Sequence, residues 1–321
     1  MYNDIKLEKG LYNLTGKSFT EALEALDPSA EYEGTPLAQL DAYQRQLKRF
    51  NIRVSGANCD CVEKFFVTTE SAILFPEFLR RSIKKGFDET IIGTIVAAKS
   101  NCDCNKYIGC VLTDTADYDT TDEGEALPTA TVTESSSAIT LLKYGRVINA
   151  SYEAVRQQRL DVFAVFLRGI GIKLANSIMS AAVTTLTTGI TPITTTSLTY
   201  SDLTDLCGEF SDFDMNTVLV SPANAAAIFA MTPMQEGSII DKEGKIHLPF
   251  GAELVKTPAV DDDEIIGIDR NFALELITSS DFIMETDKII NQQLDSIAVS
   301  VNCGFRRLTD DAVQVLSITE E

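Results

Sequence analysis

The sequence predicts a mixed α+β protein, and three observations carry this prediction. Apolar residues recur every three or four positions across residues 158–186, which predicts one long helix of about eight turns. Short helical and strand patterns alternate over residues 198–277, which is typical of a small α/β layer. Apolar and small or polar residues alternate over residues 297–305, the period of a half-buried strand.

The composition indicates a soluble globular protein. The 321 residues are 45% hydrophobic and 23% charged, enough for one large domain or two or three small ones. We expect no transmembrane helix, because no run of about 18 apolar residues exists. We expect no secretory signal and a cytoplasmic site of synthesis and action, since the first residues lack an apolar core.

The formal net charge is −20. A surface that neutralises nucleic-acid phosphates needs clustered Lys and Arg, so the charge argues against one. It does not exclude a wall that encloses nucleic acid, because repulsion keeps such a wall from adhering to its contents. A generic acidic cytosolic protein has the same charge.

Residues 1–66 are polar and contain two short helical patterns. Ser18 and Glu21 form a capping-box pattern before the first, residues 19–26. Pro36 opens the second, residues 37–50. Neither helix can bury a core alone, so the segment is interpreted as an arm that packs against something else.

The next part changes from helix to strand to loop. A short helix broken near Pro76 is followed by a buried strand within residues 90–100. Residues 116–138 are acidic, rich in Thr and Ser and almost without large apolar side chains. That composition cannot fold by itself and predicts a projecting hairpin or flexible loop.

Residues 139–151 are extended and lead into the long helix. A Thr-rich linker follows over residues 184–199, and a long loop over residues 232–251 carries the only histidine. The alternating pattern between these segments is interpreted as a second domain inserted in the first.

This order of segments resembles that of the major capsid proteins of tailed bacteriophages, which have the Hong Kong 97 fold. Four phrases carry the resemblance: TTESAILFPEFLRRSIKKG, ITLLKYGRVINASYEAVRQQRLDVFAVFLR, TVLVSPANAAAIF and the closing strand pair. It implies an α+β, Hong Kong 97-like capsid fold with an N-terminal arm, an extended loop, a spine-helix domain and an inserted apical α/β domain. The implied boundaries are 1–66 for the arm, 67–115 for the first part of the peripheral (spine) domain, 116–138 for the extended loop, 139–195 for the spine-helix region, 196–277 for the apical (axial) domain and 278–321 for the closing strands.

The resemblance implies a structural protein and not an enzyme. Subunits would form pentamers and hexamers of an icosahedral shell around phage double-stranded DNA, assembled in the host bacterial cytoplasm. Scaffolding, portal and cement proteins are possible partners, with no membrane and no cofactor. Two alternatives are an encapsulin-like nanocompartment with the same fold, and a cytosolic hydrolase or nucleotide-binding enzyme.

In such a shell the arm and the extended loop would be ordered only by neighbouring subunits. The acidic part of the loop would favour a basic surface. The candidate contact residues are Asp117, Asp119, Asp122, Glu123, Glu125, Arg80, Arg81, Lys84 and Lys85. Some relatives join a loop Lys to an Asn of another subunit. Residues 116–138 contain no Lys, so we expect a non-covalent shell.

The motifs for enzymatic chemistry are weak. Gly10 and the Gly16-Lys17-Ser18 run are one residue too far apart for a phosphate-binding P-loop, and no buried strand precedes them. His247 is the only histidine and is interpreted as structural. The acidic run 261–264 lacks the spacing of a calcium loop, which favours a solvated turn.

Two Cys-x-Cys pairs are the most chemically informative motif, Cys59 with Cys61 and Cys102 with Cys104. If adjacent strands brought them together, four thiolates could hold zinc, although the usual spacing is wider. We favour reduced, metal-free thiols, because thiols stay reduced in a cytoplasm and a shell protein gains its stability from assembly.

Overall fold

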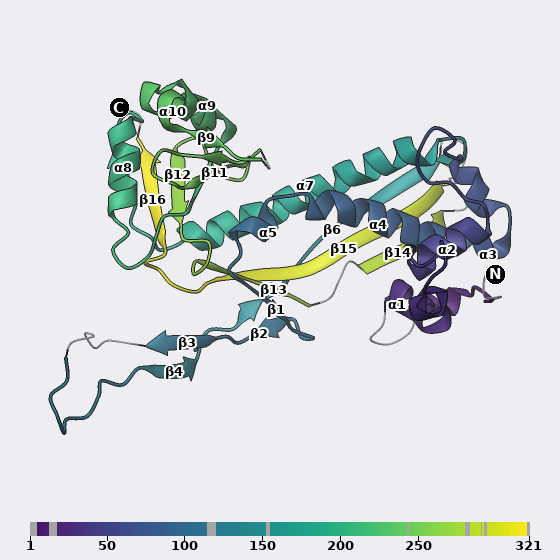
Figure 1. The fold of residues 1–321 in the computed structure, drawn as a ribbon, viewed down its shortest axis with the longest axis horizontal. Helices are drawn as coiled ribbons and strands as arrows, with labels where there is room; N and C mark the ends of the chain where they lie inside the picture. Colours follow the sequence, from purple (N-terminus) through teal and green to yellow (C-terminus); the bar gives the residue numbers. More distant parts are fainter. Residues whose placement is uncertain are drawn as a thin grey trace. The chain divides into compact units, whose positions relative to one another are not determined.

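The computed structural model describes most of the chain as two compact units (Figure 1). The described residues are 5–12, 18–113, 120–151, 155–242, 244–279, 283–289, 291 and 294–319. Unit 1 comprises residues 1–89, 145–174 and 282–300. Unit 2 comprises residues 90–144, 175–281 and 301–321.

Unit 1 is mainly helical. Its helices are η1 (Lys9–Tyr12), α1 (Phe19–Leu26), η2 (Ser29–Tyr32), α2 (Ala42–Arg49), η3 (Val62–Phe66), α3 (Thr69–Ala72), α4 (Phe75–Asp88) and the first half of α7 (Leu160–Thr187). Its strands are most of β6 (Leu142–Ser151), β14 (Ile283–Ile289) and the first half of β15 (Leu294–Arg307). The long helix predicted over residues 158–186 is therefore confirmed.

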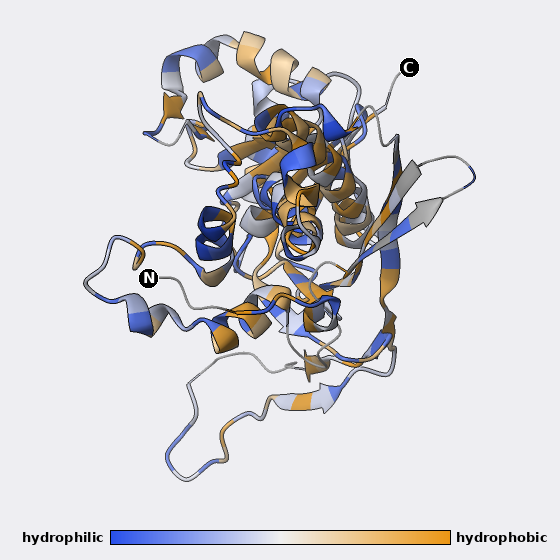
Figure 2. Ribbon diagram, turned by 90° about the vertical axis from the view of Figure 1, so that its right-hand side faces the viewer, coloured by the Kyte–Doolittle hydropathy of each residue, from blue (hydrophilic) through white to orange (hydrophobic). Residues whose placement is uncertain are grey.

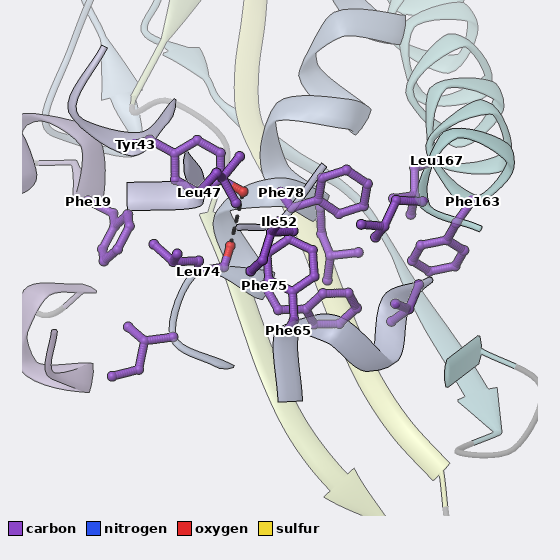
Figure 3. Packing of buried hydrophobic residues seen from close by; sticks show 14 of the residues in the cluster. Phe19, Tyr43, Leu47, Ile52, Phe65, Leu74, Phe75, Phe78, Phe163 and Leu167 are labelled. Atoms are coloured by element: carbon purple, nitrogen blue, oxygen red, sulfur yellow. Dashed lines mark hydrogen bonds between the residues drawn. The ribbon is translucent and has the colours of Figure 1, made fainter. Parts of the chain in front are cut away.

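The N-terminal helices are part of the core of unit 1. Phe19, Tyr43 and Leu47 are buried together with Phe78 of α4 and Phe163 of α7 (Figure 3). The Tyr43 hydroxyl also donates a hydrogen bond to the carbonyl of Leu74 at 3.2 Å. The expectation that this segment is ordered only by neighbouring subunits is therefore wrong, because its apolar faces pack within its own chain.

Both N-terminal helices begin at capping boxes. Ser18 and Glu21 cap α1 as predicted. The second helix starts at Ala42 and not near Pro36, because Asp41 and Gln44 form its capping box. The prediction of a helix over residues 37–50 is therefore too long at its N-terminal end.

Two further elements differ from the sequence prediction. Pro76 lies in the first turn of a 14-residue helix, α4, where its missing N–H has no consequence. Within residues 90–100, the Ile-rich part forms the short helix α5 (Ile92–Ile95), whose two isoleucines are buried three positions apart. The strand β1 (Ala98–Asn101) begins only after it.

Unit 2 contains a seven-stranded sheet and three covering helices. The strand order is β7–β16–β12–β8–β11–β10–β9. The strands are β7 (Ile193–Thr195), β8 (Thr217–Val220), β9 (Ile239–Ile240), β10 (Ile246–His247), β11 (Glu253–Lys256), β12 (Glu264–Ile268) and β16 (Val313–Ile318). The helices are α8 (Tyr200–Gly208), α9 (Pro222–Ala230) and α10 (Thr232–Gly237). Side chains of all three helices join the core of this sheet.

The α/β layer is confirmed, with two corrections to its connections. The predicted Thr-rich linker contains β7, which pairs in parallel with β16. The predicted long loop over residues 232–251 contains α10 and the β9–β10 hairpin. Elements of two to six residues are too short to show the periodicity by which sequence alone reveals an element.

A second sheet contains β1, β6, β13 (Leu274–Thr278), β14 and β15. Strand β13 pairs with β15 here and not with the neighbouring strand β12. The alternation predicted over residues 297–305 is confirmed, because its five apolar side chains are buried. Two-stranded pairs are made by β2 (Lys106–Tyr107) with β5 (Ile139–Thr140) and by β3 (Cys110–Thr113) with β4 (Thr131–Glu134).

Candidate assembly surfaces

The β3–β4 hairpin presents apolar side chains to solvent. Leu112 and Val132 are direct cross-strand partners, so both point to one face, and each is about two-thirds exposed. Leu127, in the connecting segment, is 77% exposed. Hydrophobic and hydrophilic colours alternate along the hairpin, which lies at the bottom of Figure 2. Such an element has no core of its own and is marginal without a partner.

The hairpin segment also carries one sign of charge. Residues 107–142 contain seven Asp or Glu and no Lys or Arg. Of the predicted contact residues, Asp122, Glu123 and Glu125 are exposed. Asp117 and Asp119 lie outside the described residues.

In unit 1, α4 and α7 approach closely because each offers a glycine to the other. A Cβ on Gly86 would lie 2.1 Å from the carbonyl oxygen of Arg168. A Cβ on Gly171 would lie 2.1 Å from the carbonyl oxygen of Ile83. Only glycine fits at this helix crossing, and the crossing fixes the position of the surface that α4 and α7 share.

One face of α7 remains uncovered in unit 1. Val162, Val165, Phe166 and Ile172 are exposed at helical spacing, and Phe166 is 64% exposed. This row of four residues is called the α7 stripe. A contiguous exposed apolar row is typical of an interaction surface.

Helix α7 is long and apolar enough to cross a membrane, judged by length and composition alone. Core helices of soluble proteins satisfy the same criterion. The helix contains no unbroken run of about 18 apolar residues, because Asp161, Arg168 and Lys173 interrupt it.

The predicted basic surface on α4 contains two side chains that already have partners. Glu77 is fully buried and receives Arg80 Nε on one carboxylate oxygen and Arg81 Nε on the other, both at 2.8 Å. Arg81 also reaches Asp41 at 2.6 Å, and Thr20 donates to Glu77. Burial alone would raise the pKa of Glu77, but the hydrogen bonds and charges of the two arginines outweigh it and lower the pKa.

The other two predicted cations lie at the surface. Lys84 and Lys85 line a shallow open depression together with Arg81, Asp88 and Glu89. Lys85 is exposed. On the acidic side of this depression Glu89 binds Arg168 at 2.6 Å, and Asp88 is exposed. The depression therefore carries both signs of charge.

The two cysteine pairs belong to different units. Cys59 accepts a hydrogen bond from the amide of Asp161, and Cys102 accepts one from the amide of Cys104. Burial raises the pKa of the Cys59 thiol. Across the described residues, no group of three His, Cys, Asp or Glu side chains has the arrangement of a metal site.

The remaining motifs have structural environments. His247 lies in β10, and its Nε2 is 3.3 Å from Asp241. Gly10 lies in η1, whereas Gly16 and Lys17 lie outside the described residues. Of the run 261–264 predicted as a solvated turn, Asp261 to Asp263 lie in the exposed segment before β12, whereas Glu264 is half-buried and begins β12.

Comparisons with known proteins agree with this arrangement. The family model described as phage capsid protein matches residues 133–300, which are 168 of the 321 residues. The chain belongs to the phage capsid protein family. It is a structural, major capsid protein, and its place is the capsid of a virion. No curated protein sequence matches it.

Solved structures show the same fold at low identity. A virus-like particle from Pyrococcus furiosus matches with a TM-score of 0.53 and 11% identity, over 75% of this chain and 98% of its own. The capsid of an empty GTA particle matches with a TM-score of 0.54 and 15% identity, over 70% of this chain and 88% of its own. The holo-SrpI encapsulin complex of Synechococcus elongatus PCC 7942 matches with a TM-score of 0.52 and 15% identity, over 70% of this chain and 86% of its own. The Hong Kong 97-like α+β fold of this capsid protein is thus established.

Sequence reasoning missed two parts of these surfaces. It did not identify Arg306 and Glu275, which meet at the root of the hairpin. It also treated Arg80 and Arg81 as open contact residues. Glu77 lies three and four positions before these arginines, and this spacing was the available signal.

Proposed function

We propose that this capsid protein assembles as pentamers and hexamers into an icosahedral shell that encloses double-stranded phage DNA without reading its sequence. The observation that supports this most strongly is the family match together with the fold. The net charge of −20 suits a wall that does not adhere to packed DNA. The chain needs no catalytic step and no cofactor for this role, and we propose that it is not an enzyme.

We propose that the hairpin of one copy lies over unit 1 of another. The Leu112–Val132 face would cover the α7 stripe, and the acidic tip would meet Lys84 and Lys85. Opposite charges and two exposed apolar surfaces support this pairing. Each exposed ion pair contributes only about 0–1 kcal/mol, so the contact gains strength by repetition around a closed shell.

The domain boundaries inferred from the resemblance, from 1–66 to the closing strands at 278–321, are retained as proposals, but residues 1–66 are proposed as an N-terminal segment packed in unit 1 and not as an arm held by a neighbour. The apical domain would meet its copies around the capsomer axis. Assembly would take place in the host cytoplasm, with scaffolding, portal and cement proteins as further candidates. The cysteine pairs would remain reduced and metal-free.

Electron microscopy of the purified protein at high concentration tests this function. We expect closed particles with nuclease-protected DNA when they are isolated from infected cells. A protein cargo in place of DNA would identify an encapsulin-like compartment, and a small oligomer that never forms shells would contradict the proposal. Boiled, reduced particles should migrate as one band near 35.1 kDa, because the extended loop lacks a Lys for a covalent link.

A further inference from the structure

The root of the hairpin, where β3 begins at Cys110 and β4 ends at Glu134, is joined to a buried carboxylate in unit 2. Glu275 of β13 is 5% exposed. Its Oε1 accepts hydrogen bonds from Ser100 of β1 at 2.5 Å and from Tyr107 of β2 at 3.0 Å. Its Oε2 has no hydrogen-bond partner and lies 3.6 Å from Nη1 of Arg306. A buried carboxylate depends strongly on a neighbouring cation, here Arg306.

Arg306 connects this carboxylate to the hairpin. It is the direct cross-strand partner of Glu275 on β15. Its Nη2 donates a hydrogen bond to the carbonyl of Cys110, the first residue of β3. The guanidinium lies against Gly109, where a Cβ would be 1.8 Å from Nη1. One planar side chain therefore contacts both the sheet and the hairpin root.

Other contacts also hold the chain at this root: Leu141, directly after β5, is buried, and β6, which follows it, pairs with β15. The amide of Ser135 donates to the carbonyl of Gly109 at 2.8 Å and closes the hairpin. The β2–β5 pair, next to the root, consists of only two residue pairs. A short two-stranded element has little stability of its own, so its direction depends on its anchors.

We propose that Arg306 is a positioning residue that fixes the direction of the hairpin through Glu275. Loss of the Arg306–Glu275 pair frees the hairpin root while the seven-stranded sheet stays folded. The consequence for assembly rests on the proposed function, because it requires that the hairpin contacts a second copy. The consequence for the free subunit does not.

Hydrogen exchange of the full-length, unassembled protein tests the proposal. For Arg306→Met we expect exchange at residues 109–113 and 131–135 to accelerate about tenfold or more, while β8 and β12 change less than about twofold. Glu275→Gln should act in the same direction. Arg306→Lys keeps the cation without the second planar donor and should restore part of the protection. Lys106→Met, an exposed cation at the same root, is the matched control and should have no effect.

Two results would overturn the proposal. The first is unchanged exchange at the hairpin root in both Arg306→Met and Glu275→Gln. The second is equal acceleration in β8 and β12, which would show a general loss of stability. Electron microscopy of the same variants separates the two ideas. If wild type forms no shells, the proposed function fails. If Arg306→Met forms normal shells at normal yield, the positioning role in assembly is wrong.

Discussion

The N-terminal helices and the β3–β4 hairpin are two segments that cannot bury a core alone, yet the first is buried and the second is exposed. The N-terminal helices have apolar residues at helical spacing, and these residues fill the core of unit 1. The hairpin exposes its apolar side chains instead. A segment without its own core is therefore not necessarily an arm for a neighbour, because its partner can lie in the same chain.

Polar groups reinforce this difference. Arg45 of α2 is fully buried, and its Nε is 2.8 Å from a carboxylate oxygen of buried Asp27. Ser29 and the carbonyls of Leu40 and Asp27 accept its other hydrogen bonds. The guanidinium carbon of Arg45 lies 4.5 Å from the centre of the Tyr32 ring. A buried arginine with this many partners belongs to a folded interior, and the hairpin tip has no counterpart among its described residues.

Deleting each segment in turn gives the largest contrast. Removal of residues 1–50 should unfold unit 1, because each large buried side chain contributes about 1.5–3 kcal/mol and a whole domain has only about 5–15 kcal/mol of stability. Replacement of residues 120–127 by a short Gly-Ser turn should leave the free energy of unfolding within about 0.5 kcal/mol of the wild-type value. The same replacement should abolish regular shells. Chemical denaturation and electron microscopy measure both. A folded unit 1 after the first deletion would restore the arm interpretation.

Glu77 offers the strongest point substitution. Glu77→Gln leaves two arginines without their carboxylate and should destabilise the protein by about 3 kcal/mol. Glu70→Gln is the control, since Glu70 is partly exposed and its ion pair with Arg49 is long, at 4.0 Å. This substitution should lower the free energy of unfolding by less than about 1 kcal/mol. Equal effects of the two variants in urea denaturation would show that the buried network is unimportant.

The crossing of α4 and α7 can be tested with two glycines of α7. Gly171→Ala places a methyl group against the backbone of α4 and should destabilise by about 1–3 kcal/mol. Gly169→Ala, with open space beside it, should stabilise by about 0.5–1 kcal/mol because alanine favours helix. If both variants shift the melting temperature in the same direction, the prediction that Gly171 permits the close approach of α4 and α7 is wrong.

Acid should act on the N-terminal helices through Glu77. Its pKa is below the usual 4.5, so the stability that it contributes is fully present above pH 4.5 and is lost as pH falls through the lower folded value. Glu77→Gln should therefore flatten the decline of stability below pH 4.5. Glu123→Gln, at the exposed hairpin tip, should leave the decline unchanged. The free energy of unfolding from pH 6 to pH 2 decides between these outcomes.

The sequence predicts the elements that have long periodic patterns. Helix α7, the alternation in β15 and the capping box of α1 are confirmed. Of the hairpin alternative predicted for residues 116–138, β4 lies within these residues, whereas its partner β3 precedes them. Each depends on residues near one another in the chain, where period and capping chemistry are directly visible.

Contacts between distant residues could not be predicted in the same way. Gly86 and Gly171 look like ordinary helix glycines until α4 and α7 are placed together. Glu275 and Arg306 become partners only through the register of β13 and β15. The N-terminal helices appeared to be an arm because their buried partners, such as Phe163, lie about a hundred residues away along the chain.

The absence of cations from the hairpin has a consequence for protease mapping. Trypsin cleaves after Lys and Arg, and the segment between Lys106 and Lys143 contains neither. A complete digest should therefore release residues 107–143 as a single acidic peptide. Its appearance or absence in a digest of intact particles reports whether both ends of the hairpin are accessible, so the chain contains its own mass-spectrometric tag for this element.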